Sequence, residues 1–235
     1  MSSAQSSPLK LTIGVLIFPD STQWLDFAGP VDYLHSHSRE YFELLKWGAP
    51  HIVEKAPSIQ WHFLSASGTL DPVHATAGPL QTPTTTFATC PPLDYLLVPG
   101  PDPAIQLSEE GTKFIQDRFP TLKGLFTVCT GSVIIAKTGV LDGLQVTTNK
   151  MVAAYMTEFL TMSKNVKWVV DRRFVVDGKV WSGAGVTAGI DLMAEFVRVN
   201  FDPELAQVVQ SMTEYKPNPA QPDPFAHITK DLKFD

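Results

Sequence analysis

Short apolar runs alternate with longer segments of helical length along most of the chain. Residues rich in strand formers occupy positions 11–18, 60–66, 95–98 and 125–128, and segments long enough for helices occupy 30–47, 109–119 and 130–138. Because parallel neighbouring strands need a crossover connection, this alternation predicts an α/β sandwich with a mostly parallel central sheet and right-handed crossovers.

Two further regions have the pattern of β-hairpins. Residues 69–86 contain several glycines and prolines and have no helical period, which indicates a β-ribbon. Farther along, residues 168–170 and 174–176 flank polar turns, and Asp177-Gly178 joins 174–176 to 180–182. A turn of this kind between strand formers predicts a second hairpin.

The two ends differ from the rest of the chain. Residues 1–9 are polar and lack the apolar stretch of a signal peptide, so we expect a short disordered tail. Residues 216–235 carry four closely spaced prolines, too many for regular structure, so this tail should lie on the surface or clasp a neighbour. Residues 10–215 are expected to form a single domain.

Composition limits the classes of partner. The 235 residues are 44% hydrophobic and 18% charged, as in a compact protein with a large core, and the net charge of −6 argues against a nucleic-acid surface. No apolar stretch is long enough to cross a bilayer. Two cysteines are too few for a disulfide framework and fit a reduced cytoplasm. The expected partner is a small molecule.

Cys129 is the candidate for chemistry. It stands between an apolar strand and a helix in the sequence V-C-T-G-S, where a tight turn presents a side chain at the carboxyl edge of a sheet. The helix N-terminus there favours the thiolate, which is the nucleophilic form. Free cysteines are also often inert core residues, and the turn alone does not decide between the two interpretations.

Four polar loops follow predicted strands and should meet at one edge of the sheet. They are residues 19–26, 99–102, 129–130 and 183–189. Ligands of open α/β sheets bind outside the carboxyl ends of the strands. One cleft could therefore contain a thiol, a carboxylate, a hydroxyl and several backbone amides.

The same loops carry a family resemblance. The motifs F-P-D-x-x-x-x-L-D-F-A-G-P, L-D-Y-L-L-V-P-G, V-C-T-G-S-x-I-I-A-x-x-G-V-L-D-G and W-S-G-A-G-V-T-A-G-I-D resemble the ThiJ/PfpI superfamily and, within it, the isonitrile hydratase-like branch. The resemblance covers residues 11–215 and implies a flavodoxin-like three-layer sandwich that forms a homodimer. It also implies that Cys129 is the nucleophile, Asp26 its acidic partner and Thr130 the residue that follows the nucleophile.

The positions of the histidines argue against a cysteine–histidine relay. Related glutaminases have a histidine base after the cysteine, and many PfpI-like relatives have one directly after it, where this chain has Thr130. Five of the six histidines precede Cys129 and the sixth, His227, lies in the proline-rich tail. Asp26 is then the group expected to transfer protons.

For an isonitrile, these groups suggest a defined reaction. Cys129 attacks the terminal carbon and a thioimidate forms, after which Asp26 activates water and an N-substituted formamide is released. The N–H groups of Thr130 and Gly100 could stabilise charge at the reacting centre.

The chain departs from the family pattern at two places. Pro101 stands where family members usually have a second glycine, and Asn149-Lys150 stands where the resembling enzymes often have His-Trp. Pro101 has no N–H and stiffens its loop, so the position of the substrate is expected to differ.

The pocket should suit a small, mainly apolar ligand and contain neither a metal nor an organic cofactor. Small residues around Gly185 allow close approach to a ligand, and aromatic residues beside Asp26 exclude water. The expected lining residues are Gly100, Trp24, Phe27, Pro101, Gly185 and Val186.

Structural roles remain open for several of these residues. Asp26 could cap the helix that follows it, and Thr130 could bond only to backbone. Asp191 and Cys90 are interpreted as structural. His35 and His37 are not expected to bind a metal together, since side chains two residues apart on a helix diverge.

Two other functions fit the same fold. The ligand-sensing half of some AraC-type regulators resembles this branch, although those chains continue into a DNA-binding region. A glyoxalase-like or chaperone-like carbonyl-stress protein would use the same cysteine without a hydratase pocket.

Overall fold

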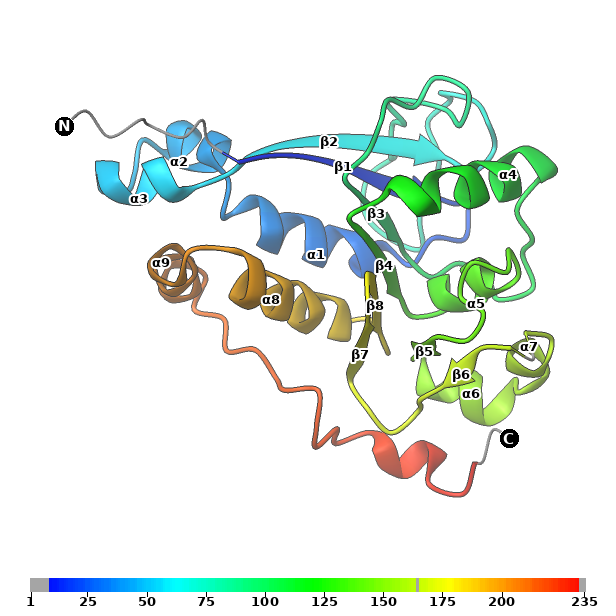
Figure 1. Ribbon diagram of the computed structural model, residues 1–235. Helices are drawn as coiled ribbons and strands as arrows, with labels where there is room; N and C mark the ends of the chain where they lie inside the picture. Colours follow the sequence, from blue (N-terminus) through cyan, green and yellow to red (C-terminus); the bar gives the residue numbers. More distant parts are fainter. Residues whose placement is uncertain (1–8, 164, 233–235) are drawn as a thin grey trace.

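A six-stranded sheet forms the centre of the molecule in the computed structural model, which describes residues 9–163 and 165–232 (Figure 1). Its spatial order is β2-β1-β3-β4-β8-β7, and every pair is parallel except β7 with β8. The strands are β1 (Lys10–Ile17), β2 (Ser58–Ser65), β3 (Tyr95–Val98), β4 (Gly124–Val128), β7 (Phe174–Asp177) and β8 (Val180–Gly183). The predicted mostly parallel sheet is confirmed.

Helices cover both faces of this sheet and complete three layers. On one face lie α1 (Trp24–His35), α8 (Ala188–Asn200) and α9 (Pro203–Thr213); on the other lie α4 (Glu109–Arg118), η1 (Phe119–Thr121) and α5 (Gly131–Ala136). Each face has its own cluster of buried apolar side chains. This is the flavodoxin-like sandwich that the alternating pattern and the family resemblance predicted.

The predicted helix at 30–47 is wrong in its bounds. α1 begins six residues earlier, with Pro30 inside it, and ends at His35. The chain then turns, because the Ser36 hydroxyl donates to the Asp32 carbonyl and the Ser38 side chain caps a new helix, α2 (Arg39–Leu45). A third short helix, α3 (Pro50–Lys55), follows.

One of the predicted hairpin pairings near the C-terminal half of the chain is confirmed and the other is wrong. The turn at Asp177-Gly178 joins antiparallel β7 and β8 as predicted, with Gly178 at φ +57°. The segment 168–170 does not pair with β7; instead β6 (Lys167–Trp168) pairs in parallel with β5 (Gln145–Val146), a two-stranded sheet that the sequence did not suggest.

The predicted ribbon at 69–86 forms no strand. It is reduced to isolated bridges, one joining Val73 and Gln81 and another joining Leu64 and Thr85. Prolines in this segment lack the N–H groups that a longer ladder requires.

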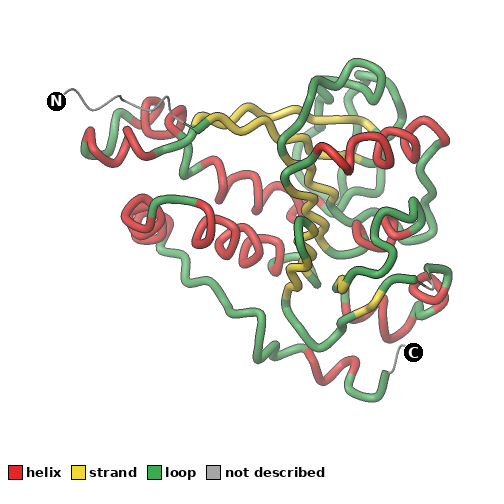
Figure 2. Tube along the Cα trace, in the orientation of Figure 1, coloured by secondary structure: helices red, strands yellow, loops and turns green. Residues whose placement is uncertain are grey.

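Along the chain, two short helices, α6 (Lys150–Tyr155) and α7 (Glu158–Thr161), connect β5 to β6. The segment after α9 runs as a long loop past β7 to the region of α6, where it ends in a single turn, η2 (Ala226–Thr229) (Figures 1 and 2). It packs on its own chain: the Arg173 N–H donates to the Ala220 carbonyl at 2.9 Å, and the Thr229 hydroxyl donates to the Val170 carbonyl at 2.8 Å. The predicted N-terminal tail lies outside the described residues except for Leu9.

Among the residues that the structure describes, no helix is long and apolar enough to span a bilayer.

Candidate active site

Cys129 lies at the sharp turn between β4 and α5. Its backbone has φ +58°, a left-handed conformation that is strained for a residue with a side chain. The turn is held on both sides, since the Cys129 N–H donates to the Gly183 carbonyl at 3.0 Å while its own carbonyl accepts the hydroxyls of Ser132 and Thr148. The thiol is thereby fixed at the carboxyl end of the sheet.

Asp26 faces this thiol from the first turn of α1. Its side chain is fully buried, Oδ2 accepts the Gly100 N–H at 2.9 Å, and Oδ1 has no nitrogen or oxygen partner. Burial raises the pKa of Asp26 to about 7, and hydrogen bonds from Gly100 and Cys129 limit the rise. A carboxyl group with this pKa can both accept and release a proton near neutrality.

Cys129 itself is held as a thiol. Burial, together with the negative charge of Asp26, raises its pKa to about 12, against the opposing hydrogen bonds of the Thr130 N–H and the Asn149 side chain. The sequence predicted a thiolate stabilised by a helix N-terminus. The difference has a physical cause: α5 has only six residues, whereas Cys129 is only 8% exposed and lies beside a carboxylate.

Gly100 contributes to the site differently from the prediction. Its N–H donates to Asp26 and so is not free to stabilise charge on a substrate. A Cβ at this position would lie 2.6 Å from the Thr130 hydroxyl and 2.8 Å from Asp26 Oδ2, so glycine is needed for the loops to approach. Gly100 is thus a positioning element for the carboxyl group.

Thr130 contacts two parts of the site. Its hydroxyl donates to the Pro101 carbonyl. Both its N–H and its side chain also oppose the rise in the pKa of the Cys129 thiol, so Thr130 does not bond only to backbone. The Thr130 N–H is therefore the available main-chain donor at the reacting centre, and Pro101 acts through its carbonyl rather than as an exposed wall.

Asn149 is a site residue that the sequence interpretation treated only as a departure from the family pattern. Its Oδ1 accepts the N–H groups of Met151 and Val152 and caps α6. The Nδ2 group is then directed to the sulfur of Cys129. The available signal was an asparagine directly before a helix, a position where its side-chain oxygen is committed and its amide nitrogen is left to act elsewhere.

A recess of about 220 Å³ begins beside Asn149. Its walls include Gly185 and Val186, two residues that the sequence analysis named as pocket lining, together with Met151 and residues of the C-terminal segment. Trp24 lies elsewhere, in a separate groove on the outer side of α1. Phe27 is buried in the core cluster that also contains Cys129.

The contacts of Asp26 and Asp191 distinguish their roles. Asp26 does not cap α1, since the N-cap is Gln23 and no side chain bonds there. Asp191 is structural as predicted, because it pairs with Arg173 and accepts hydrogen bonds from Tyr215 and Asn218.

Cys90 is buried among apolar residues away from the loops of the site. Burial raises its pKa to about 11. Within residues 9–163 and 165–232, no three His, Cys, Asp or Glu side chains gather as a metal site would require.

A thiol at a strained strand–helix turn, paired with a buried carboxyl group on a flavodoxin-like sheet, defines a class of α/β proteins. Residues 12–199 match the model of the DJ-1/PfpI family. The chain belongs to this family.

Relatives within the family fall into two groups by their names. The isonitrile hydratase of Pseudomonas putida is 33% identical over 214 residues, which cover 90% of this chain and 81% of the hydratase. The HTH-type transcriptional regulator GbdR of Pseudomonas aeruginosa is 29% identical over 67% of this chain, which spans only 41% of the regulator.

Solved structures agree on the fold. A ThiJ/PfpI family protein from Pseudomonas syringae superposes with a TM-score of 0.70 and 27% identity, covering 93% of this chain and 78% of that one. Drosophila melanogaster DJ-1beta superposes with a TM-score of 0.66 at 15% identity, covering 88% of this chain and all of that chain.

Proposed function

We propose that this protein hydrates isonitriles to N-substituted formamides, with Cys129 as nucleophile and Asp26 as general acid and base. The observation that carries the proposal is the buried pair itself: a thiol that keeps its proton lies against a carboxyl group whose pKa is about 7. The similarity to a hydratase of this name over most of the chain supports the same chemistry.

In the first step, the ionised Asp26 takes the thiol proton as the sulfur attacks the terminal carbon of the isonitrile. A carbon–sulfur bond forms, and Asp26 returns the proton to that carbon. The product is a thioimidate, R–N=CH–S–Cys129. No isolated thiolate is required, which suits a sulfur whose anion is disfavoured by burial.

In the second step, Asp26 accepts a proton from water as the water oxygen attacks the thioimidate carbon, and it passes this proton to the nitrogen, which gives R–NH–CH(OH)–S–Cys129. Asp26 then accepts the hydroxyl proton as the carbon–sulfur bond breaks, and it passes that proton to the departing sulfur. The formamide R–NH–CHO leaves and both groups return to their starting states. Donors from the Thr130 N–H and the Asn149 amide support negative charge on the sulfur.

A second candidate is a ligand-sensing domain, and one observation favours it: the regulator GbdR matches this chain over 67% of its length. A sensing domain would bind its ligand without turnover. The carbonyl-stress alternative uses the same cysteine on 2-oxoaldehydes.

A substrate panel separates the three functions. Wild-type protein is incubated with isonitriles and, separately, with 2-oxoaldehydes, and products are identified by NMR. The hydratase proposal expects a formamide from isonitriles. Consumption of 2-oxoaldehydes without any formamide favours the carbonyl-stress function, and binding without turnover favours sensing.

We further propose that the protein acts in the cytoplasm as a homodimer. The two free cysteines are compatible with a reducing compartment. The dimer follows from the family resemblance.

A further inference from the structure

The C-terminal segment forms part of the wall of the recess that starts at Asn149. Phe225 and Ile228 from this segment line the recess together with Val186 and Met151. The family model ends at residue 199, so this wall comes from a part of the chain outside the matched family region.

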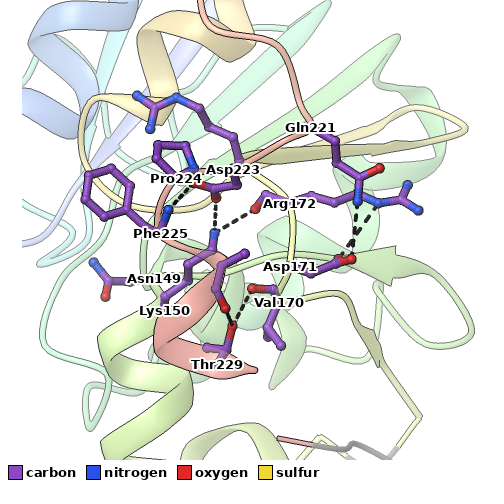
Figure 3. Close-up of polar contacts among 12 residues, drawn as sticks. Asn149, Lys150, Val170, Asp171, Arg172, Gln221, Asp223, Pro224, Phe225 and Thr229 are labelled. Atoms are coloured by element: carbon purple, nitrogen blue, oxygen red, sulfur yellow. Dashed lines mark hydrogen bonds and ion pairs between the residues drawn. The ribbon is translucent and has the colours of Figure 1, made fainter. Parts of the chain in front are cut away.

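A buried ion pair fastens the segment in place. Lys150 and Asp223 are paired with their side chains 5% and 1% exposed, and the Lys150 ammonium also donates to the Arg172 carbonyl at 2.8 Å (Figure 3). Asp223 Oδ1 in turn accepts the Phe225 N–H at 3.0 Å, which orients the first residue of the wall.

The ion pair lies close along the chain to a residue that holds the Cys129 turn. Lys150 begins α6 directly after Asn149, whose side chain lines the recess (Figure 3). Thr148, the residue before Asn149, donates its hydroxyl to the Cys129 carbonyl at 2.9 Å, and the Asn149 side chain opposes the rise in the pKa of the Cys129 thiol. We take a group attached to the atom that Cys129 attacks to extend past Asn149 into this space.

The recess presents no net charge. Lys150 is neutralised by Asp223, and the other cation in its walls, Arg173, is paired with Asp191. A charged substituent would lose its hydration without gaining a partner, whereas an apolar one would contact Met151, Val186, Phe225 and Ile228. A cavity of about 150 Å³ with apolar walls holds benzene, so about 220 Å³ accommodates a six-membered ring or a short branched chain.

We infer that the C-terminal segment is the specificity-determining wall of the site, and that it selects substrates with a neutral, ring-sized apolar substituent. The inference rests on the proposed attack by Cys129, but its test does not require formamide to be made.

The test compares a small and a ring-bearing reagent of each kind on the full-length protein. Alkylation of Cys129 is followed by mass spectrometry with iodoacetamide and N-benzyl iodoacetamide, and turnover is followed with methyl and benzyl isonitrile. Ile228→Trp fills the recess and Phe225→Ala opens it. Lys230→Ala, an exposed position on the same segment outside the recess, is the matched control.

For each pair of reagents, the measured quantity is the rate with the benzyl reagent divided by the rate with the small reagent. Ile228→Trp should lower this ratio by about tenfold or more, which is the discrimination expected when an apolar pocket loses room for the benzyl group. Phe225→Ala should lower the same ratio by a smaller factor through lost contact, and Lys230→Ala should leave it unchanged. Iodoacetamide should react at wild-type rates throughout, which shows that each variant is folded.

Ratios that stay within twofold of wild type in both recess variants overturn the inference. If formamide is absent but the alkylation ratios respond as expected, the recess stands and the hydratase proposal fails. If formamide forms and neither ratio responds, the hydratase proposal stands and the C-terminal segment has no part in selection.

Discussion

In the proposed mechanism, the reactivity of Cys129 depends on a neighbouring carboxyl group rather than on a stable thiolate. Both cysteines have raised pKa values through burial, yet only Cys129 has a group within reach that can remove its proton. The difference in reactivity between Cys129 and Cys90 should therefore come from Asp26.

Alkylation by iodoacetamide at pH 7.5 tests this directly. Cys129 should react at least about tenfold faster than Cys90, and Asp26→Asn should remove most of the difference because the amide cannot accept the thiol proton. Cys90→Ala is the control for site assignment. Faster modification of Cys90 would exclude Cys129 as the nucleophile.

Asp26 should also set the pH dependence of catalysis. The productive free enzyme has an ionised Asp26 beside a protonated Cys129, so kcat/KM should rise with pH through about 7 and then remain level over the accessible range. Asp26→Asn should lower the rate by ~10²–10⁴-fold. A pH profile that is flat between 5.5 and 8.5 would contradict the role of Asp26 as base.

The same raised pKa predicts that stability and activity change in opposite directions with pH: as Asp26 ionises, kcat/KM should rise and the free energy of unfolding should fall. The carboxyl group ionises near pH 4 in the unfolded chain but near pH 7 in the fold, so its contribution to folding is fully present below about pH 4 and is lost as pH rises to about 7. The full shift corresponds to about 4 kcal/mol.

Urea unfolding of wild type and Asp26→Asn between pH 5 and 8 measures this contribution. The Asn side chain keeps an acceptor for the Gly100 N–H, so the stability of the variant relative to wild type should increase from pH 5 to about pH 7 and level off above that pH. Equal pH dependence in both proteins would mean that Asp26 is ionised in the fold throughout. Subtracting the two curves removes the effect of His37, whose pKa burial lowers to about 4 in both.

At the level of elements, the loops that build the site were largely predictable from the sequence. Parallel strands end at one edge of a sheet, so the placement of Cys129, Asp26 and Gly100 near one another followed from the strand pattern alone. The pairing of β5 with β6 was not predictable, because two-residue strands carry no period.

The roles of Gly100 and Asn149 in the site could also not be predicted from the sequence. Whether an amide is free or committed depends on side-chain positions contributed by distant segments, here 74 residues apart for Asp26 and Gly100. The break at Ser36 to Ser38 in the predicted helix was missed for a similar reason, since hydroxyl bonds to backbone end α1 where the apolar pattern continues.

The loops that carry Gly100, Thr130 and Asp26 approach so closely that one added methyl group at Gly100 should destabilise the site. Gly100→Ala should clash with Thr130 and Asp26 and should reduce stability and activity together, by roughly 1–3 kcal/mol in unfolding free energy. Gly185→Ala is the matched control, since its nearest neighbour would be the Asn149 amide at 3.5 Å, an ordinary contact. Equal stability of the two variants in thermal unfolding would show that the loops can move apart.

For the whole molecule, the apolar side of α8 does not supply the surface of a dimer, because Leu192, Phe196 and Val197 are buried against the rest of the same chain. Exposed apolar side chains gather instead at two other places, around Leu44 near the end of α2 and around Tyr155 at the end of α6.

Light scattering at micromolar concentration should give the mass of a dimer. Leu44→Glu and Tyr155→Glu place a charge in each apolar region, and the one that yields a monomer identifies the interface, because an unpaired charge is costly to bury. A monomeric wild-type protein would contradict the dimer and would restrict the site to residues of one chain.

The central claim is that Cys129 adds to an isonitrile carbon and that the product leaves as a formamide. Its most direct test is the rate of formamide formation from benzyl isonitrile, followed by NMR with wild type, Cys129→Ala and Cys90→Ala. The account predicts formamide from wild type and Cys90→Ala at comparable rates and none above background from Cys129→Ala. Formamide production by Cys129→Ala at the wild-type rate, or its absence from all three proteins, would contradict the account.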